Sequence, residues 1–446
     1  MKMNSLRTPL PYDLELLKAN GQFDLVNEMI DQRLKKDIPD GLKERLLLEK
    51  EVLKEYPKSF IYTKEQAFSL IQSHIKDFTE EEFDTLFKEN AFEFIFIQGI
   101  MMFKDDIYDN LIKVHSNYRN RSDCKEKEDV ILDSTIQKLM DEKEMKMKIH
   151  VRLSLKVKDQ KEGNRIRVWL PIPVEYAQVE DFNILSMSEK GRVNDESVNH
   201  RSVYFECEYK KDMEFYVEYE FVNHMIYEEL DPSKVYDDGY SLYLDQREPH
   251  YVFTTYLKQL CNQIVKEETN PLLKAKRIYD YITSHVTYSF VPAYMTLPSI
   301  PEFAATSLKG DCGIQASLFI TLCRIAHIPA RWQAGLYAHP KMIGNHDWAQ
   351  FYIAPYGWLY ADCSFGGSAY RNHKDIKREF YFGHLDPYRI PSAREVLQPL
   401  VPDKKYMRKD PYDHQTGEAE YIDCPISPED IDTKQEIIEI KELNDI

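Results

Sequence analysis

Hydrophobic residues in the first part of the chain recur at spacings of mostly three and four, which is the period of an amphipathic helix. They form one apolar stripe over Tyr12–Leu34, and a second stripe over Leu42–Tyr56 stops before Pro57. Thr79 and Glu82 match the capping-box pattern, which predicts the start of a further helix. The opening of the chain is therefore predicted to be helical.

The same spacing continues to about Ile112 and returns over Val130–Met140, after a polar stretch at residues 116–128. We therefore predict that residues 1–145 form an N-terminal all-α accessory domain. The pattern leaves open whether this domain also docks a protein partner.

Near Met147 the period of the pattern changes from 3.6 to 2. Every second residue between Ile149 and Val157 is hydrophobic, which predicts a half-buried strand. The alternation returns over residues 166–170, 203–208 and 215–222. Several short strands in one stretch predict a small β-sandwich over residues 146–225, with structural support as its role.

Residues 226–400 combine the two patterns. Helical spacing over Pro249–Lys266 and Pro271–His285 is followed by a proline-containing loop and by a strongly apolar helix over Ile314–Ala326. Two strands come next, joined by a turn at Pro355–Gly357. This region is predicted to be an α+β domain, which makes the whole chain an α+β multidomain protein.

The last segment, residues 401–446, is expected to be an acidic C-terminal extension, with a peripheral helix or a loose tail from about Pro425. A chain of 446 residues is long enough for several domains, and its formal net charge is −17. An acidic surface repels the nucleic-acid backbone and anionic lipid. Neither a nucleic acid nor a membrane surface is therefore an expected partner.

The cysteines and the hydrophobic runs favour a cytoplasmic protein. The first residues contain no apolar run of signal-peptide length, and the longest apolar stretch, residues 92–103, is too short to span a bilayer. Seven cysteines are dispersed along the chain without a Cys-x-x-Cys pair, which is typical of reduced thiols rather than of a disulfide framework.

Cys312 is the first candidate for chemistry. Gly310 and Asp311 form a helix breaker and an N-cap, so the pattern places Cys312 on the first turn of the apolar helix. Unpaired backbone N–H groups at a helix start carry partial positive charge, which favours a thiolate over a thiol. At this point a second interpretation stays open, in which Cys312 is a small packing residue.

His346 and Asp362 are the second and third candidates. His346, Trp348, Gln350 and Tyr352 share one face of the first predicted strand, and Asp362 ends the second strand. A hairpin between these strands can set the carboxylate beside the imidazole, where it would fix the tautomer and stabilise the imidazolium. The three residues then follow the order of a nucleophile, a base and an orienting group.

Four ordered motifs carry a family resemblance over roughly residues 250–370. They are the Gly-Asp-Cys-Gly helix start, the Cys-Arg-Ile-Ala-His-Ile-Pro-Ala-Arg run, His-Asp-Trp on one strand, and Trp-Leu-Tyr-Ala-Asp-Cys on the next. This stretch resembles the transglutaminase-like superfamily, and residues 146–225 resemble the amino-terminal sandwich of its bacterial members. The resemblance implies a papain-like α+β core whose nucleophilic Cys, strand His and following Asp map onto Cys312, His346 and Asp362.

The chain departs from the family pattern at four positions. It has His327 where the family motif has Gly, Asp347 where many relatives have Ala, Gln350 where many have Glu, and Cys363 where Pro is usual. These changes leave the three candidates in place, and they leave the class of substrate open.

An oxyanion needs hydrogen-bond donors aimed at the developing negative charge. The backbone N–H of Cys312 is the first expected donor, and Tyr288 is the candidate for the second, with a core aromatic as the alternative interpretation. Trp348 and Gln350 are candidates for the wall of the cleft. The spacing of the cysteines and histidines does not match a structural zinc site, and no phosphate-binding loop is present, so neither a metal nor a cofactor is expected.

The leading hypothesis is cysteine-dependent acyl transfer at an amide bond of a peptide or protein, through a thioester. Hydrolysis, as by a peptidase or amidase, is the first expectation, and protein-glutamine transglutamination is the second. An alternative of a different class is a catalytically silent binding module that keeps the fold, since a fold does not by itself establish a reaction.

Overall fold

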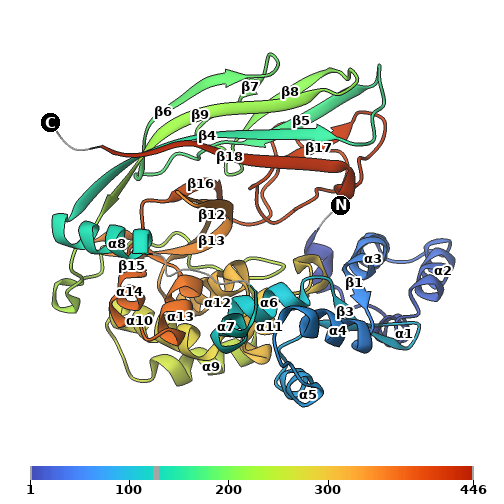
Figure 1. The fold of residues 1–446 in the computed structure, drawn as a ribbon, viewed down its shortest axis with the longest axis horizontal. Coiled ribbons are helices and arrows are strands. Elements are labelled where there is room, and N and C mark those ends of the chain that lie inside the picture. The colour runs from blue at the N-terminus through green and yellow to red at the C-terminus, as the bar shows by residue number, and fades with distance from the viewer. Residues whose placement is uncertain (1–2, 124–129, 444–446) are drawn as a thin grey trace. The chain divides into compact units, whose positions relative to one another are not determined.

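The computed structural model describes residues 3–123 and 130–443, and their contacts divide the chain into two compact units (Figure 1). Unit 1 consists of Met1–Asp129, Gln246–Thr254 and His285–Ile314, and unit 2 consists of Val130–Asp245, Thr255–Ser284 and Gln315–Ile446. The chain passes between the units several times, and the last passage falls in the first turn of helix α12 (Cys312–Ile325).

Helices dominate the N-terminal part of unit 1, as the pattern predicted. The predicted helix over residues 12–34 is interrupted near Gly21, whose φ of 74° belongs to the left-handed region that favours glycine. The capping box at Thr79 and Glu82 is confirmed. The helices are α1 (Tyr12–Ala19), α2 (Phe23–Leu34), α3 (Asp40–Glu55), α4 (Lys64–His74), α5 (Glu80–Lys88), α6 (Ile107–Val114) and α7 (Ser116–Arg121).

The prediction of an all-α N-terminal domain is wrong, because unit 1 contains a small antiparallel sheet in the order β1-β3-β2. Strands β2 (Phe94–Ile97) and β3 (Ile100–Lys104) form a hairpin, with β1 (Phe60–Tyr62) on the other side of β3. The two residues between β2 and β3 both have positive φ values, which suits a tight hairpin turn. A short apolar run fits a strand as well as a helix, and periodicity alone does not separate the two.

The described strands of the β-rich region form two four-stranded antiparallel sheets, in the orders β18-β4-β9-β6 and β17-β5-β8-β7 (Figure 1). Side chains of the long strands alternate between buried and half-exposed, and the rings of Phe205 and Phe215 meet at 5.7 Å between the two sheets. The strands of residues 146–225 are β4 (Glu144–Val157), β5 (Arg165–Pro171), β6 (Val179–Met187), β7 (Arg192–Val193), β8 (Ser202–Glu208) and β9 (Glu214–Ile226).

The C-terminal segment is neither a peripheral helix nor a loose tail. It supplies β17 (Glu418–Tyr421) to one sheet and β18 (Ile431–Leu443) to the other, where β18 pairs with β4 along its whole length. Its acidic residues favour a solvated tail, although exposed and more buried positions alternate over parts of the strand. Charges on an edge strand such as β18 also hinder the addition of a further strand.

A five-stranded sheet in the order β15-β14-β13-β12-β16 forms the core of the remaining part of unit 2. Helix α12 packs on β13, since the rings of Phe319 and Phe351 lie 5.5 Å apart. The strands are β12 (Ala330–His339), β13 (Met342–Ile353), β14 (Gly357–Ala361), β15 (Phe382–Gly383) and β16 (Arg389–Arg394), and the other helices are α8 (Val130–Glu142), α9 (Thr255–Val265), α10 (Pro271–His285), α13 (Cys363–Arg371) and α14 (Asp375–Phe380).

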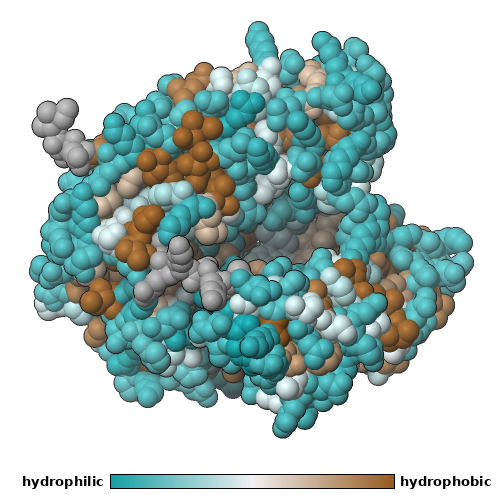
Figure 2. Space-filling model, in the orientation of Figure 1, coloured by the Kyte–Doolittle hydropathy of each residue, from teal (hydrophilic) through white to brown (hydrophobic). Residues whose placement is uncertain are grey.

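The predicted hairpin of β13 and β14 is confirmed, with Ala349 opposite Ala361 and Ile353 opposite Gly357. Helices and strands are therefore mixed in unit 2, with the predicted hairpin inside its five-stranded sheet. The face of the molecule in Figure 2 is largely hydrophilic, as expected for a chain with a net charge of −17. Among the described residues, no helix is long and apolar enough to cross a membrane.

Acidification is expected to destabilise unit 2 through a buried histidine. His384 contacts Glu228 O at 2.9 Å, and burial lowers the pKa of its imidazole to about 4. Because its pKa is about 6.5 in the unfolded chain, the unfolded state takes up the proton first. The free energy of unfolding is therefore unaffected by this group above pH 6.5, and it falls as the pH is lowered from 6.5 to 4. Urea unfolding across this range should show that the free energy of unfolding falls by roughly 2–3 kcal/mol less in His384→Phe than in the parent protein.

The matched control for this measurement is His74→Phe, since His74 is exposed. This control should keep the fall in stability between pH 6.5 and 4 that His384→Phe loses. An unchanged pH dependence in His384→Phe would contradict the assignment of the effect to His384.

Candidate active site

Cys312 is the first residue of α12, as predicted, and it is half-buried. The carboxylate of Asp311 accepts a hydrogen bond from the backbone N–H of Ile314 at 3.0 Å, which makes Asp311 the N-cap. Tyr294 donates its hydroxyl to the same carboxylate oxygen at 2.5 Å. The sulfur thus lies at a capped helix N-terminus, where the helix dipole stabilises negative charge.

The segment that leads into Cys312 is anchored to the N-terminal part of unit 1. Strand β11 (Lys309–Gly310) pairs in parallel with β10 (Thr287–Tyr288). Lys309 forms a largely buried ion pair with Glu93 and donates to the backbone oxygen of Asn90 at 3.1 Å. The N-terminal residues, predicted as accessory, therefore help to position the strand before the cysteine.

His346 lies on β13, opposite Gly335 on β12. Only glycine fits at position 335, since a Cβ there would meet the backbone oxygen of Ile390 at 1.8 Å. His346 is 5% exposed, and its ring lies among aromatic rings, with Phe365 at 4.7 Å and Trp348 at 5.8 Å between ring centroids. The histidine is therefore held in a mostly dry, aromatic environment.

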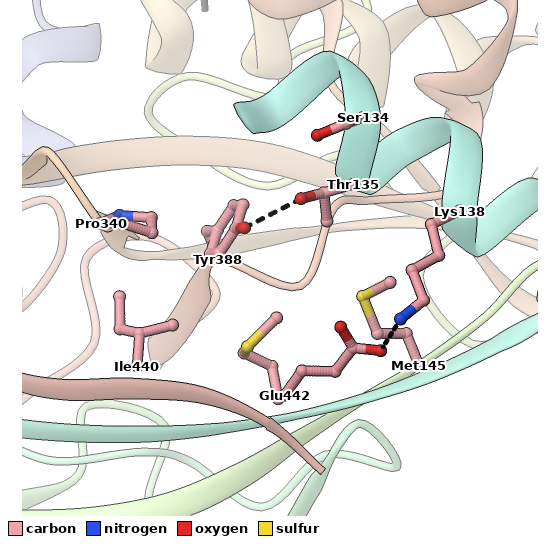
Figure 3. A pocket seen from close by; sticks show the side chains of 9 residues that line it. Ser134, Thr135, Lys138, Met145, Pro340, Tyr388, Ile440 and Glu442 are labelled. Carbon is pink, nitrogen blue, oxygen red and sulfur yellow. Dashed lines mark hydrogen bonds and ion pairs between the residues drawn. The ribbon is translucent and has the colours of Figure 1, made fainter. Parts of the chain in front are cut away.

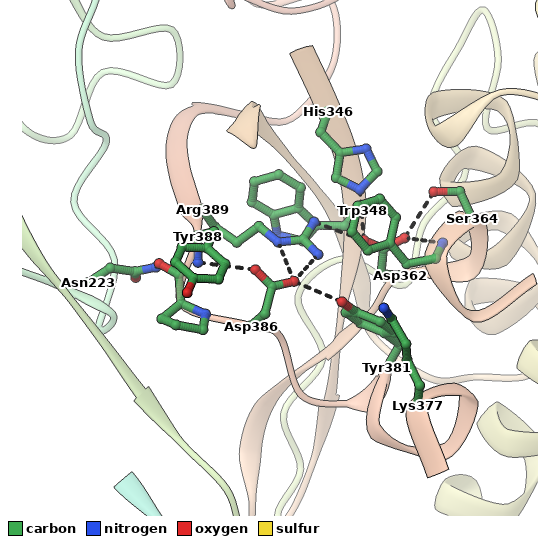
Figure 4. A network of polar contacts seen from close by, with 12 residues as sticks. Asn223, His346, Trp348, Asp362, Ser364, Lys377, Tyr381, Asp386, Tyr388 and Arg389 are labelled. Atoms are coloured by element: carbon green, nitrogen blue, oxygen red, sulfur yellow. Dashed lines mark hydrogen bonds and ion pairs between the residues drawn. The ribbon is translucent and has the colours of Figure 1, made fainter. Parts of the chain in front are cut away.

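Asp362 follows β14 and is almost completely buried. Its Oδ2 atom lies 2.7 Å from Nε2 of His346 (Figure 4). Its Oδ1 atom accepts hydrogen bonds from the hydroxyl of Ser364 at 3.0 Å and from the backbone N–H of Phe365 at 2.9 Å, which makes Asp362 the N-cap of α13. One carboxylate therefore orients the imidazole and starts the next helix.

The contact with Asp362 determines the tautomer of His346. A carboxylate only accepts hydrogen bonds, so Nε2 carries the proton and Nδ1 is the nitrogen with a lone pair. Burial lowers the pKa of His346, and the neighbouring Asp362 opposes that effect. Burial would raise the pKa of Asp362, but His346 and Arg389 together hold it well below its usual range. The pair is therefore poised as neutral imidazole and carboxylate.

The structure adds two charged residues that the sequence did not reveal as candidates. Arg389 donates from Nη1 to Oδ2 of Asp362 at 2.8 Å and from Nη2 to Asp386 at 2.5 Å (Figure 4). Tyr381 also donates to Asp386, at 3.0 Å. No spacing rule connects Arg389 with a carboxylate 27 residues earlier, so only the fold brings them together.

The remaining sequence candidates have other contacts. Tyr288 lies with its hydroxyl 3.2 Å from Nζ of Lys113, and its role as an oxyanion donor stays a prediction. Trp348 is fully buried and donates its indole N–H to Gln333, so it packs beneath His346 and is not an exposed cleft wall. Gln350 is buried as well.

Three of the four residues that depart from the family pattern have defined structural contacts or backbone geometry. Gln350 accepts a hydrogen bond from Arg331 at 2.8 Å. Asp347 accepts one from Gln415 at 2.7 Å, and the same amide lies 3.2 Å from the backbone oxygen of His346. His327 has a φ of 62°, the left-handed conformation that glycine would adopt after a helix.

A separate cavity of about 330 Å³ in unit 2 is lined by residues of α8, β4 and β18 (Figure 3). Tyr388 lies at this cavity, where its hydroxyl is 2.9 Å from the hydroxyl of Thr135, and its backbone N–H donates to Asp386. His346 and Asp362 are not part of the lining. Among the described residues, no cluster of His, Cys, Asp and Glu has the geometry to hold a metal ion.

Residues 258–363 match the family model of the transglutaminase-like superfamily. The chain contains a transglutaminase-like core. The matched stretch includes Cys312, His346 and Asp362, and this match supports a protein of the cysteine-dependent acyltransferase or protease kind.

The individual proteins that resemble this chain have low sequence identity to it. An uncharacterized protein of Haemophilus influenzae is 29% identical over 137 residues, which are 26% of this chain and 37% of the length of that relative. A "putative cysteine protease" from Cytophaga hutchinsonii is 16% identical, with a TM-score of 0.42, over 68% of this chain and 92% of that chain. The periplasmic domain of TgpA from Pseudomonas aeruginosa is 14% identical, with a TM-score of 0.29, over 55% of this chain and 95% of that chain.

Proposed function

We propose that this protein is a cysteine-dependent acyl-transfer enzyme that cleaves an amide bond of a peptide or protein through a thioester. Cys312 is the nucleophile, His346 is the base and then the acid, and Asp362 orients the imidazole. The observation that carries the proposal is the buried contact between Nε2 of His346 and Asp362, which leaves Nδ1 as the basic nitrogen.

The reaction begins when the thiol proton of Cys312 passes to Nδ1 of His346. The sulfur attacks the amide carbonyl carbon, and the backbone N–H of Cys312 stabilises the oxyanion. The C–N bond breaks as the imidazolium gives its proton to the leaving amine, and a thioester remains. Water then attacks the thioester, His346 takes one of its protons, and the C–S bond breaks to release a carboxylic acid and the thiol.

Asp362 contributes by holding the imidazole in one tautomer and by stabilising the imidazolium that forms in both half-reactions. Its second oxygen is fixed by Ser364 and the start of α13, so the carboxylate cannot turn away from the ring. A rigid carboxylate lowers the cost of reaching the reactive geometry.

Alkylation of Cys312 by iodoacetamide tests the proposal, because it reports the thiolate directly. An ordinary thiol has a pKa of about 8.5, and Cys312 should be alkylated rapidly at a clearly lower pH. His346→Ala should remove this low-pH reactivity. The half-buried Cys207 provides an internal control with an unrelated thiol. Slow alkylation with an ordinary pH profile in the parent protein would favour a silent binding module.

Water is the proposed acceptor of the acyl group, and the cytoplasm is the proposed compartment. Dansylcadaverine and a glutamine-containing peptide separate the two reactions of the thioester. Both reactions release ammonia when the thioester forms; hydrolysis then yields a glutamate peptide, whereas a transglutaminase yields a peptide labelled with the amine. Labelled peptide that forms faster than the glutamate peptide would replace the hydrolase by a protein-glutamine transglutaminase.

A further inference from the structure

A fully buried chain of charges lies behind the imidazole. Asp362, Arg389 and Asp386 alternate in sign, and both Arg389 and Asp386 have no exposed surface (Figure 4). We infer that Arg389 and Asp386 are positioning residues: Arg389 keeps Asp362 ionised, Asp386 offsets the cation, and together they set how readily His346 accepts a proton. This inference deepens the proposed function and rests on it for its catalytic meaning.

Arg389 directly contacts the carboxylate that orients His346. Nη1 of Arg389 and Nε2 of His346 contact the same oxygen of Asp362, at 2.8 and 2.7 Å. A cation on that oxygen draws negative charge away from the imidazole and makes protonation of the ring harder. Arg389 alone would therefore weaken His346 as a base.

Asp386 compensates for this effect. Its Oδ2 atom accepts from Nη2 of Arg389 at 2.5 Å and from Nε at 3.2 Å, so the guanidinium is shared between two carboxylates. With a neutral imidazole the three groups carry a net charge of −1, and protonation of His346 brings the cluster to zero. The surplus negative charge of Asp386 thus favours the imidazolium that the thiolate and the leaving amine require.

Aromatic rings seal this cluster from water. The centroids of four rings lie 4.7 to 5.8 Å from the guanidinium carbon of Arg389, and they belong to Phe365, Tyr337, Trp348 and Tyr381. Exclusion of water strengthens the interaction between the charges, and ring faces stabilise the cation. Buried ion pairs contribute little to stability on average, since desolvation offsets their attraction. Stability alone is therefore a weak explanation for three buried charges beside His346.

The other titratable groups around His346 add little charge. Tyr337 of β12 and Tyr381 before β15 are neutral phenols near pH 7, and burial raises the pKa of Tyr381 further. Burial also raises the pKa of Cys363, which stays a thiol. Asp347 points away on the other face of β13, where Gln415 binds it, and burial raises the pKa of Asp413 beside it. Asp386 is the carboxylate that remains to balance Arg389.

A compensation experiment tests the inference. Asp386→Asn leaves the cation of Arg389 uncompensated, so the pKa of His346 should fall by about one unit. Adding Arg389→Met removes the cation as well, and the pKa of His346 should return to the parent value or above. NMR titration of histidine-labelled full-length protein gives both values, with His346 assigned by the signal that His346→Ala lacks.

If Arg389 and Asp386 had only a structural role, the double variant would have lost more contacts than Asp386→Asn. The pKa of His346 should then differ more from the parent value in the double variant than in Asp386→Asn. Urea unfolding of the same proteins measures that loss separately. Arg389→Lys is the conservative control, and it should keep the pKa of His346 near the parent value. An unchanged or raised pKa in Asp386→Asn, or no reversal in the double variant, would overturn the inference. Cys312 alkylation in the same samples reports on the proposed function independently, since the NMR titration does not require a reactive cysteine.

Discussion

Cys312→Ala is expected to abolish formation of an acyl-enzyme. With p-nitrophenyl acetate as a probe, the parent protein should release nitrophenolate in a burst, because the thiolate is acetylated faster than the thioester is hydrolysed. Alanine offers no sulfur to acetylate, so the burst should disappear and turnover should fall by three or more orders of magnitude, roughly as for loss of other catalytic nucleophiles. The burst amplitude and the mass of the intact protein measure the result.

Cys207→Ala is the matched control for this loss. Cys207 is half-buried on β8, far along the chain from the hairpin that carries His346, and its removal should leave the burst unchanged. Cys363 lies directly after Asp362 and is buried, with a raised pKa of its thiol. An acetyl group found on Cys363 in Cys312→Ala, with a full burst, would show that the nucleophile had been assigned to the wrong cysteine.

The parts of the fold that the sequence predicted are those governed by local patterns. The capping box at Thr79 and the hairpin of β13 and β14 follow from short-range rules for turns, caps and alternation. The hairpin has a further consequence, because its register, with Ala361 opposite Ala349, brings Asp362 close to His346. The spacing of the two strands in the sequence is therefore enough to predict His346 and Asp362 as a candidate pair.

The parts that could not be predicted depend on contacts between distant segments. Arg389 meets Asp362 only because β16 pairs with β12 in the same sheet, and nothing near Arg389 in the sequence marks this. The sequence does not predict strand β18, because its acidic residues are typical of a solvated tail and its partner β4 lies almost three hundred residues earlier. The composition of a segment indicates whether it is solvated, whereas strand pairing depends on a partner strand that this composition does not reveal.

The same long-range contacts couple the C-terminal segment to the strand of the candidate base. Gln415 donates to the backbone oxygen of His346 and to Asp347, and Gln435 of β18 donates to Asn345 at 3.1 Å. The residues on either side of His346 are therefore held by a segment that completes the two β-sheets. These sheets support the site through hydrogen bonds to the residues beside His346, and this is where the structural role predicted for them would act.

Asp362→Asn is expected to remove both the reactive tautomer of His346 and part of the stability of unit 2. If the amide keeps its oxygen on α13, its NH2 group faces Nε2 of His346 and the guanidinium of Arg389, which are both donors. The imidazole can relieve this conflict by moving its proton to Nδ1, which removes the base. A fall in the acylation rate of about ten-thousand-fold follows from comparable changes in His–Asp pairs. Loss of a buried ion-pair partner should also cost roughly 3–5 kcal/mol of unfolding free energy.

Asp386→Asn separates the two effects, because it removes a carboxylate from the same guanidinium without touching His346. Its loss of stability should be similar, while its imidazole should keep the proton on Nε2 and its burst should survive with a slower acylation. Nitrogen chemical shifts of His346 identify the tautomer in both variants, and urea unfolding gives the stabilities. An Asp362→Asn protein that kept the Nε2 proton and a rapid burst would show that the carboxylate serves the fold alone, since stability would then fall without any change in the imidazole.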